Sequence, residues 1–354
     1  MSYYRNSGAR VCYHRLNTEV IAVFGRISRG IPILVLVLCL AARFAAAQDV
    51  NVHIEPHKKP EAPPAEIKED PALQTHTKPM KVDVDLVLVP VTVTDPNNRL
   101  VTGLEKDNFQ IFEANSWQEI RHFSSEDAPI SLGVIFDVSG SMSNKIAKSR
   151  DAVVEFFKTA NPQDEFFLVT FADKPELLAD FTQSIEDIQG KLVYAVPKGR
   201  TALLDAIYMG LSKMRDAKHN KKALLIISDG GDNRSRYTDG EIKSLVREAD
   251  VQIYSIGIFD DVRGTPEEIR GPYLLSEITD VTGGRTFPIS DINDLADVAI
   301  KIGVELRNQY VLGYRPKNVV RDGKWRKLKV KLVAPKGLPT LNVHSKTGYY
   351  APQQ

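Results

Sequence analysis

Three side chains that offer oxygen follow an apolar run at a spacing of two residues. Asp137, Ser139 and Ser141 come directly after the apolar residues 134–136. Carboxylate and hydroxyl oxygens suit Mg²⁺, Mn²⁺ or Ca²⁺, whereas Zn²⁺ is usually held by sulfur and imidazole. Because both hydroxyls are neutral, a divalent cation held here would keep positive charge and attract an outside carboxylate. On spacing alone, the same residues could form only a turn and a helix N-cap.

Two later stretches of the chain present the same kinds of oxygen donor. Thr201 lies in a glycine-containing loop that opens an amphipathic helical pattern, so its hydroxyl is available as a ligand. Asp229 follows residues 222–228, which have the pattern of a strand buried on both faces. The carboxyl ends of strands in open parallel sheets are where ligands bind. A second hydroxyl and a second carboxylate are therefore expected at that edge.

Taken together, the three loops resemble the von Willebrand factor A (VWFA) domain and its metal-ion-dependent adhesion site, over roughly residues 129–312. The resemblance implies three hydroxyl ligands and two carboxylates that act mostly through water: Ser139, Ser141, Thr201, Asp137 and Asp229. All five are present in the right order. The whole chain is most similar to the secreted VWFA-related proteins of acidobacteria, which implies β-rich segments on both sides of such a domain.

The central part of the chain alternates strand patterns with helix patterns. Amphipathic stripes typical of helices separate four apolar, β-branched runs near residues 132–136, 166–171, 223–228 and 252–257. This alternation predicts an α/β fold, a doubly wound and mostly parallel sheet with helices on both faces. Thr238 and Glu241 are spaced as a capping box at the start of one helix, and Gly283-Gly284 should end another.

The segments that flank the central part alternate with a period of two residues. Strands are predicted in three stretches before it and two after it: residues 81–94, 109–112, 119–123, 327–332 and 341–345. Neither set is large enough to fold alone. We therefore predict one small β-sandwich formed by both flanks, with the α/β domain inserted. Lys327, Lys329 and Lys331 form either a solvated face that resists edge pairing or an anion-binding stripe.

The first 47 residues have the three parts of a secretory signal. Arginines precede an apolar run at residues 31–42, and Ala45-Ala46-Ala47 follows, so cleavage is expected after Ala47. An uncleaved membrane anchor is the alternative, although this run is short for a span of about 20 residues. We expect a secreted, periplasmic or envelope protein. Both cysteines, Cys12 and Cys39, lie within this segment, so the mature chain would have no disulfide.

The predicted organisation has five parts: signal peptide 1–47, proline-rich linker 48–80, N-terminal β segment 81–128, VWFA domain 129–312, and C-terminal β segment 313–354. The linker histidines at 53, 57 and 76 are interpreted as solvated. Asp232, Asp260 and Asp261 are interpreted as turn residues rather than a second cation site. Without residues 1–47 the chain has 40 basic and 44 acidic residues, a formal charge of −4, so the basic surface typical of nucleic-acid binding is not expected.

Three classes of function remain. A binding module would use the cation, most readily Mg²⁺, to capture an Asp or Glu side chain of a partner protein. A metal-dependent hydrolase would need a general base or nucleophile beside the metal, and the three loops position no His, Cys or Lys by motif. We therefore expect no enzyme. In the third class, a structural or assembly protein, the metal would only stabilise the fold.

Overall fold

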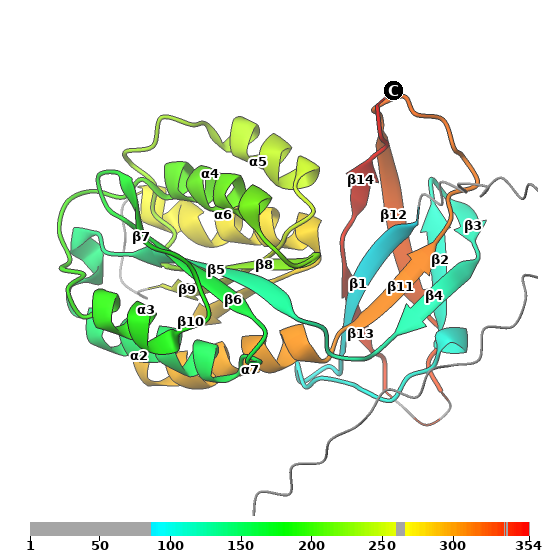
Figure 1. Cartoon of the computed structure of the whole chain (residues 1–354), viewed down its shortest axis with the longest axis horizontal. Coiled ribbons are helices and arrows are strands. Elements are labelled where there is room, and N and C mark those ends of the chain that lie inside the picture. The colour runs from blue at the N-terminus through cyan, green and yellow to red at the C-terminus, as the bar shows by residue number, and fades with distance from the viewer. Residues whose placement is uncertain (1–85, 260–265, 336, 338, 354) are drawn as a thin grey trace, which may run out of the picture. The chain divides into compact units, whose positions relative to one another are not determined.

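The computed structural model describes residues 86–259, 266–335, 337 and 339–353, which all fall within one compact unit, Pro79–Gln354. The predicted signal and linker, the start of the first predicted strand, Asp260 and Asp261 lie outside the described residues. Within the part that is described, no helix is long and apolar enough to cross a membrane. The described residues form an α/β domain and a β-sandwich (Figure 1).

The α/β domain is built on a six-stranded sheet in the order β10-β9-β8-β5-β6-β7. Its parallel strands are β5 (Ile130–Asp137), β6 (Glu165–Phe171), β8 (Lys221–Ser228), β9 (Gln252–Ile258) and β10 (Thr286–Ile289). The antiparallel edge strand is β7 (Pro175–Thr182). The predicted mostly parallel core is confirmed. Strand β7 was not predicted, because most of its side chains are exposed or half-buried and lack a two-residue apolar period.

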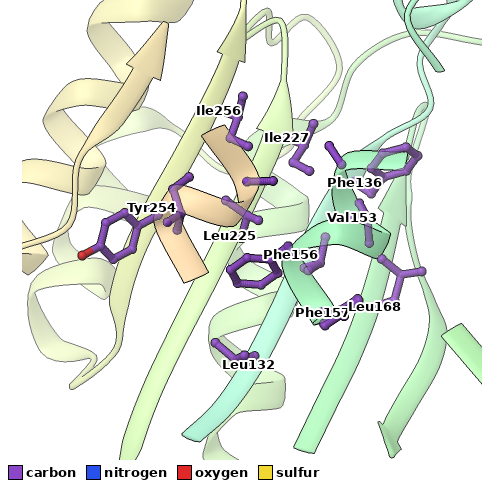
Figure 2. Close-up of a cluster of buried hydrophobic side chains, with 14 of the residues drawn as sticks. Leu132, Phe136, Val153, Phe156, Phe157, Leu168, Leu225, Ile227, Tyr254 and Ile256 are labelled. Carbon is purple, nitrogen blue, oxygen red and sulfur yellow. The ribbon is translucent and has the colours of Figure 1, made fainter. Parts of the chain in front are cut away.

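Helices cover both faces of this sheet (Figure 1). One face carries α2 (Ile146–Lys158), α3 (Ile185–Leu192) and α7 (Leu295–Arg307). The other carries α4 (Leu203–Lys213), α5 (Asp239–Glu248) and α6 (Pro266–Thr282). Figure 2 shows Phe156 and Phe157 of α2 among the buried side chains of the sheet strands, such as Phe136. Full burial of one such side chain contributes roughly 1.5–3 kcal/mol, so these contacts fix α2 on the sheet.

The predicted helix boundaries are confirmed where the side chains specify a cap. Thr238 and Glu241 form the capping box at the start of α5, with each side chain accepting the other residue's backbone N–H. Helix α6 ends at Thr282, and Gly283 follows with φ +84°, a conformation that favours glycine. The same helix begins at Pro266 and spans 17 residues.

The flanking segments form two four-stranded antiparallel sheets, in the orders β13-β1-β11-β4 and β14-β12-β2-β3. Their strands are β1 (Val87–Thr94), β2 (Phe109–Glu113), β3 (Ser116–Gln118), β4 (Ile120–Ser124), β11 (Tyr310–Tyr314), β12 (Trp325–Leu332), β13 (Asn342–Ser345) and β14 (Gly348–Tyr350). Each sheet takes strands from both flanks, because β1 pairs with β13 and β2 pairs with β12. The predicted β-sandwich is therefore present, with β11 running across the expected boundary at residues 312 and 313.

The inner faces of the two sheets share one apolar core that includes Val91, Ile111, Leu312 and Val330. Along β12, Leu328 and Val330 are buried while Lys327, Lys329 and Lys331 are exposed. The alternation predicted for this strand is thus confirmed. Arg285, just before β10, joins the two parts of the unit, since it pairs with Glu305 of α7 and donates to Asn98 of the sandwich at 3.0 Å.

Candidate metal centre

The first loop begins where β5 ends, at Asp137. All eight residues of β5 are buried, which places the Asp137 carboxylate at the carboxyl end of a central strand. The backbone N–H of Ser139 donates to Asp137 Oδ1 at 2.8 Å. The hydroxyl oxygens of Ser139 and Ser141 lie 3.0 Å apart. This loop therefore gathers one carboxylate and two hydroxyls before α2 starts at Ile146.

The second loop is attached to the first by two backbone hydrogen bonds. Lys198 N–H donates to the carbonyl of Val138 at 2.9 Å, and Gly140 N–H donates to the carbonyl of Gly199 at 3.1 Å. Gly199 has φ +80°, so the close approach of the two loops uses a backbone conformation that favours glycine. Thr201 follows two residues later. The sequence between α3 and α4 thus brings Thr201 to the edge of the sheet that carries Asp137.

The third loop is attached to both of the others. Ser228, the last residue of β8, donates its hydroxyl proton to Asp137 Oδ2 at 2.6 Å and accepts the N–H of Gly230 at 3.0 Å. Asn233 Oδ1 accepts the N–H of Thr201 at 3.0 Å, and the N–H of Asn233 returns to the carbonyl of Thr201 at 3.0 Å. The structure therefore brings the loops of all five sequence-predicted ligands together at one edge.

The five candidate ligands differ in their exposure to solvent. Four of them expose at most 6% of their residue surface: Asp137, Ser139, Thr201 and Asp229. Ser141, in contrast, is exposed. The Asp229 carboxylate accepts one long hydrogen bond, from Gly231 N–H at 3.4 Å. Thr201 makes its hydrogen bonds through its backbone. Oxygen donors are thus held in a mostly buried cluster that reaches solvent at Ser141.

The electrostatics of the cluster fit a hard divalent cation. Burial raises the pKa of Asp137 to about 7, and the negative charge of Asp229 adds to this rise. A cation beside these carboxylates would favour their charged forms. No cluster of three or more His, Cys, Asp or Glu suited to a metal is found within the described ranges. A metal at these loops would therefore depend on the hydroxyls of Ser139, Ser141 and Thr201, and the ligand roles stay a prediction.

Sequence reasoning missed the residues that position the candidate ligands. Ser228 donates a hydrogen bond to Asp137, which lies 91 residues away in the chain. Asn233 accepts one from Thr201, which lies 32 residues away. Asp232 accepts the N–H of Leu204 in the first turn of α4 at 2.9 Å and the hydroxyl of Ser235 at 2.5 Å. These bonds agree with its interpretation as a turn residue. The available signal for Ser228 was a hydroxyl at the end of a strand pattern, directly before a candidate carboxylate.

Two known proteins are similar to part of this chain. An uncharacterized protein of Borreliella burgdorferi is 24% identical over 182 residues, covering 45% of this chain and 53% of the relative. Inter alpha-trypsin inhibitor heavy chain 4 of Mus musculus is 31% identical over 153 residues, covering 39% of this chain. The chain matches only 16% of the length of that second relative.

A solved structure also aligns with most of this chain. The von Willebrand factor type A protein from Catenulispora acidiphila aligns with 75% of this chain and 74% of its own, at 13% identity and a TM-score of 0.45. Residues 132–231 match the family of the von Willebrand factor type A domain, and this range spans the first loop, Thr201 and Asp229. The chain therefore carries a von Willebrand factor type A domain.

Proposed function

We propose that this chain is a secreted or envelope-associated binding protein that captures an acidic side chain of a partner protein through a divalent cation. The cation, most readily Mg²⁺, would be held by the five candidate ligands: Asp137, Ser139, Ser141, Thr201 and Asp229. On this proposal the chain is not an enzyme. The sequence resemblance also supports a place among the secreted acidobacterial VWFA-related proteins.

The observation that carries the proposal is the joining of three loops around a mostly buried set of oxygen donors. Ser228 connects the third loop to Asp137, and the Gly140–Gly199 hydrogen bond connects the first loop to the second. Ser141, in contrast, is exposed. A cation held there would contact protein oxygens on one side and solvent on the other. The solvent side is where a partner's side chain would bind.

The charges of the donors favour an anionic partner. Only Asp137 and Asp229 are anionic, so the protein at most neutralises a divalent cation. Mg²⁺ takes six oxygens at about 2.0–2.1 Å, and three hydroxyls with water leave at least one exchangeable position. A carboxylate that replaces this water gains Coulomb energy where the surrounding protein screens less than bulk water. When bound, the metal would thus supply the attraction, and the loops would position it.

The first prediction concerns Mg²⁺ binding itself. Thr201→Ala and Ser141→Ala each remove one hydroxyl ligand, and we expect each to weaken Mg²⁺ affinity at least about tenfold by isothermal titration calorimetry. Ser143→Ala is the matched control, since Ser143 is an exposed serine of the same loop whose hydroxyl donates to the carbonyl of Gly140. Unchanged Mg²⁺ affinity in Thr201→Ala would contradict the proposed ligand set.

The second prediction concerns capture of the acidic side chain. On an array of immobilised peptides, the protein with Mg²⁺ should retain glutamate-containing peptides and not their glutamine counterparts, and a chelator should abolish retention. Ser139→Asp should still bind Mg²⁺ but lose the peptides, because the added negative charge removes the attraction of the cation for a carboxylate. Retention that persists in Ser139→Ala with chelator present would rule out a metal-bridged contact.

The alternative structural role has a separate signature. If the metal only stabilises the fold, Mg²⁺ raises the melting temperature of the wild type and not of Asp137→Ala, while no peptide is retained with Mg²⁺ present. Under the binding proposal, glutamate peptides are retained by the wild type and lost in Asp137→Ala. Measuring both properties on the same two proteins separates the two functions.

A further inference from the structure

A second candidate binding site lies between the β-sandwich and the α/β domain, in a cleft of about 990 Å³. One wall is the outer face of the sheet that contains β1, β11 and β4, including Leu88 and Val311. The other wall is formed by the start of β8 and the end of α5, including Lys222 and Arg247. This volume falls within the range of pockets that enclose ligands, which often lie between domains.

The floor of this cleft is apolar and partly open to solvent. Leu86 and Leu88 alternate with valines that face the sandwich core, and they keep 39% and 41% of their surface exposed. Both leucines lie over Gly313 of β11, since a Cβ built there would come within 3.2 Å of their δ carbons. Pro90 and Val311 continue the surface. Exposed apolar surface in a concave position marks a binding site more often than scattered single residues do.

The rim of the cleft carries an excess of positive charge. Seven lysine and arginine residues line it, against three acidic ones, Glu126, Glu248 and Asp250. The whole chain, in contrast, has 46 basic and 45 acidic residues. Lys218, Arg247 and Arg315 are exposed, and none of them forms an ion pair with another described residue. Asp250 is engaged by Lys346 at 3.1 Å. The rim therefore attracts anions.

We propose that the cleft binds an extended segment of a partner protein in which apolar and acidic residues alternate. Successive side chains of an extended peptide point to opposite sides, so apolar residues would contact Leu86 and Leu88 while acidic residues faced the rim cations. Charge complementarity argues for this partner over an uncharged apolar one. A flat lipid surface would contact the rim and would not reach the leucines between two walls.

This site is separate from the candidate metal centre. Lys221 and Lys222 open β8, whereas Asp229 follows its last residue, so the cleft and the metal loops lie at opposite ends of the same strand. A strand of this length extends over roughly 23 Å at about 3.3 Å per residue. The cleft therefore takes its ligand independently of the metal, and binding there should persist in chelator.

The test uses a short fluorescein-labelled peptide of alternating glutamate and leucine, with fluorescence anisotropy measured in chelator. We expect saturable binding that weakens as ionic strength rises, because the rim contacts are exposed to salt. Peptides in which lysine or glutamine replaces glutamate should bind at least about tenfold more weakly. Equal binding of the glutamine peptide would overturn the proposal. A second result would also overturn it: decanoate displaces the dye 1-anilinonaphthalene-8-sulfonate while no peptide binds. That result would assign the cleft to small amphiphiles.

Matched variants locate the binding. Leu88→Asp should abolish peptide binding, whereas Leu177→Asp should not, because Leu177 is a leucine of the same 41% exposure on β7, away from the cleft. Arg247→Glu should weaken binding at least about tenfold, and Lys329→Glu, an exposed lysine of β12 outside the cleft, should leave it unchanged. Wild-type affinity in both Leu88→Asp and Arg247→Glu would overturn the assignment to this cleft.

Discussion

Ser228 is a buried residue whose single hydroxyl supports two loops of the candidate metal centre. Its Oγ donates to Asp137 and accepts from the N–H of Gly230, and the residue has no exposed surface. Ser228→Ala would leave the Asp137 carboxylate and the Gly230 N–H without these partners. We expect a loss of about 1–3 kcal/mol in the free energy of unfolding, measured by urea denaturation in chelator.

Thr201→Ala is the control for this prediction. The backbone of Thr201 makes its hydrogen bonds with Asn233 and Arg234, and alanine can make the same bonds. Its stability in chelator should therefore change much less than that of Ser228→Ala, although both variants should weaken Mg²⁺ binding. Equal stability of Ser228→Ala and the wild type would show that Ser228 does not position Asp137.

His344 of β13 gives the fold a pH dependence at the level of one side chain. Burial lowers its pKa to about 4, and the nearby positive charge of Arg285 adds to the effect. In the unfolded chain the pKa of histidine is about 6.5. Between these values the unfolded chain binds more protons, so stability is complete above about pH 6.5 and falls as the pH drops toward 4. The loss is at most about 3 kcal/mol.

The measurement for His344 is urea denaturation of the wild type and His344→Gln at several pH values from 7 to 4. The free energy of unfolding should fall less steeply with acid in His344→Gln than in the wild type. His122→Gln, which replaces an exposed histidine of β4, is the control. Identical slopes in the wild type and His344→Gln would show that the half-buried His344 is not responsible.

At the scale of elements, Asp164 connects the starts of two strands to the end of a helix. Its carboxylate accepts the N–H of Ile130 at the start of β5 and the N–H of Asn161, each at 2.8 Å. The guanidinium of Arg307, at the end of α7, donates to both of its oxygens. Asp164 itself has no exposed surface. One carboxylate therefore fixes three elements of the α/β domain.

Asp164→Ala should destabilise the α/β domain strongly. The substitution leaves the largely buried Arg307 with the more exposed Asp127 as its remaining carboxylate, at 3.4 Å. Breaking a buried pair from one side costs roughly 3–5 kcal/mol, which thermal or urea unfolding would detect. Asp127→Ala removes the exposed partner of the same guanidinium and should cost no more than about 1 kcal/mol. Equal effects of the two substitutions would contradict this assignment.

The sequence predicts an element when its pattern comes from neighbouring residues in the chain. It does not predict contacts between residues that only the tertiary fold brings together. Strands β5 and β8 were predicted because buried strands are apolar throughout, and the candidate ligands Asp137 and Asp229 lie at the ends of these strands. Helix α3 and the short strands β3 and β14 were missed, since short or exposed elements carry little periodicity. The Asn233–Thr201 hydrogen bonds depend on tertiary placement of residues 32 apart. No spacing rule predicts such contacts.

At the scale of the whole molecule, the described residues contain three separate apolar cores. Two lie on the opposite faces of the central sheet, and the third lies between the two sheets of the β-sandwich. The sandwich core draws residues from both flanks, including Ile111 and Val330, and none from β5 or β8. Contacts such as Arg285 with Asn98 join the parts through polar groups. We therefore expect that the sandwich can open while the central sheet stays folded.

Val330→Asp tests this separation. Val330 is 9% exposed and pairs with Ile111 across β12 and β2, so a carboxylate at this position would be buried without a partner in the sandwich core. Native-state hydrogen exchange should show lost protection in β1 and β2, whose partners come from the C-terminal flank, and retained protection in β5 and β8. Lys329→Asp, one position along on the exposed face of β12, should preserve protection in all four strands. If Val330→Asp also exposed the amides of β5 and β8, the sandwich and the α/β domain would unfold as one cooperative unit, and metal binding at the loops would then depend on both flanks.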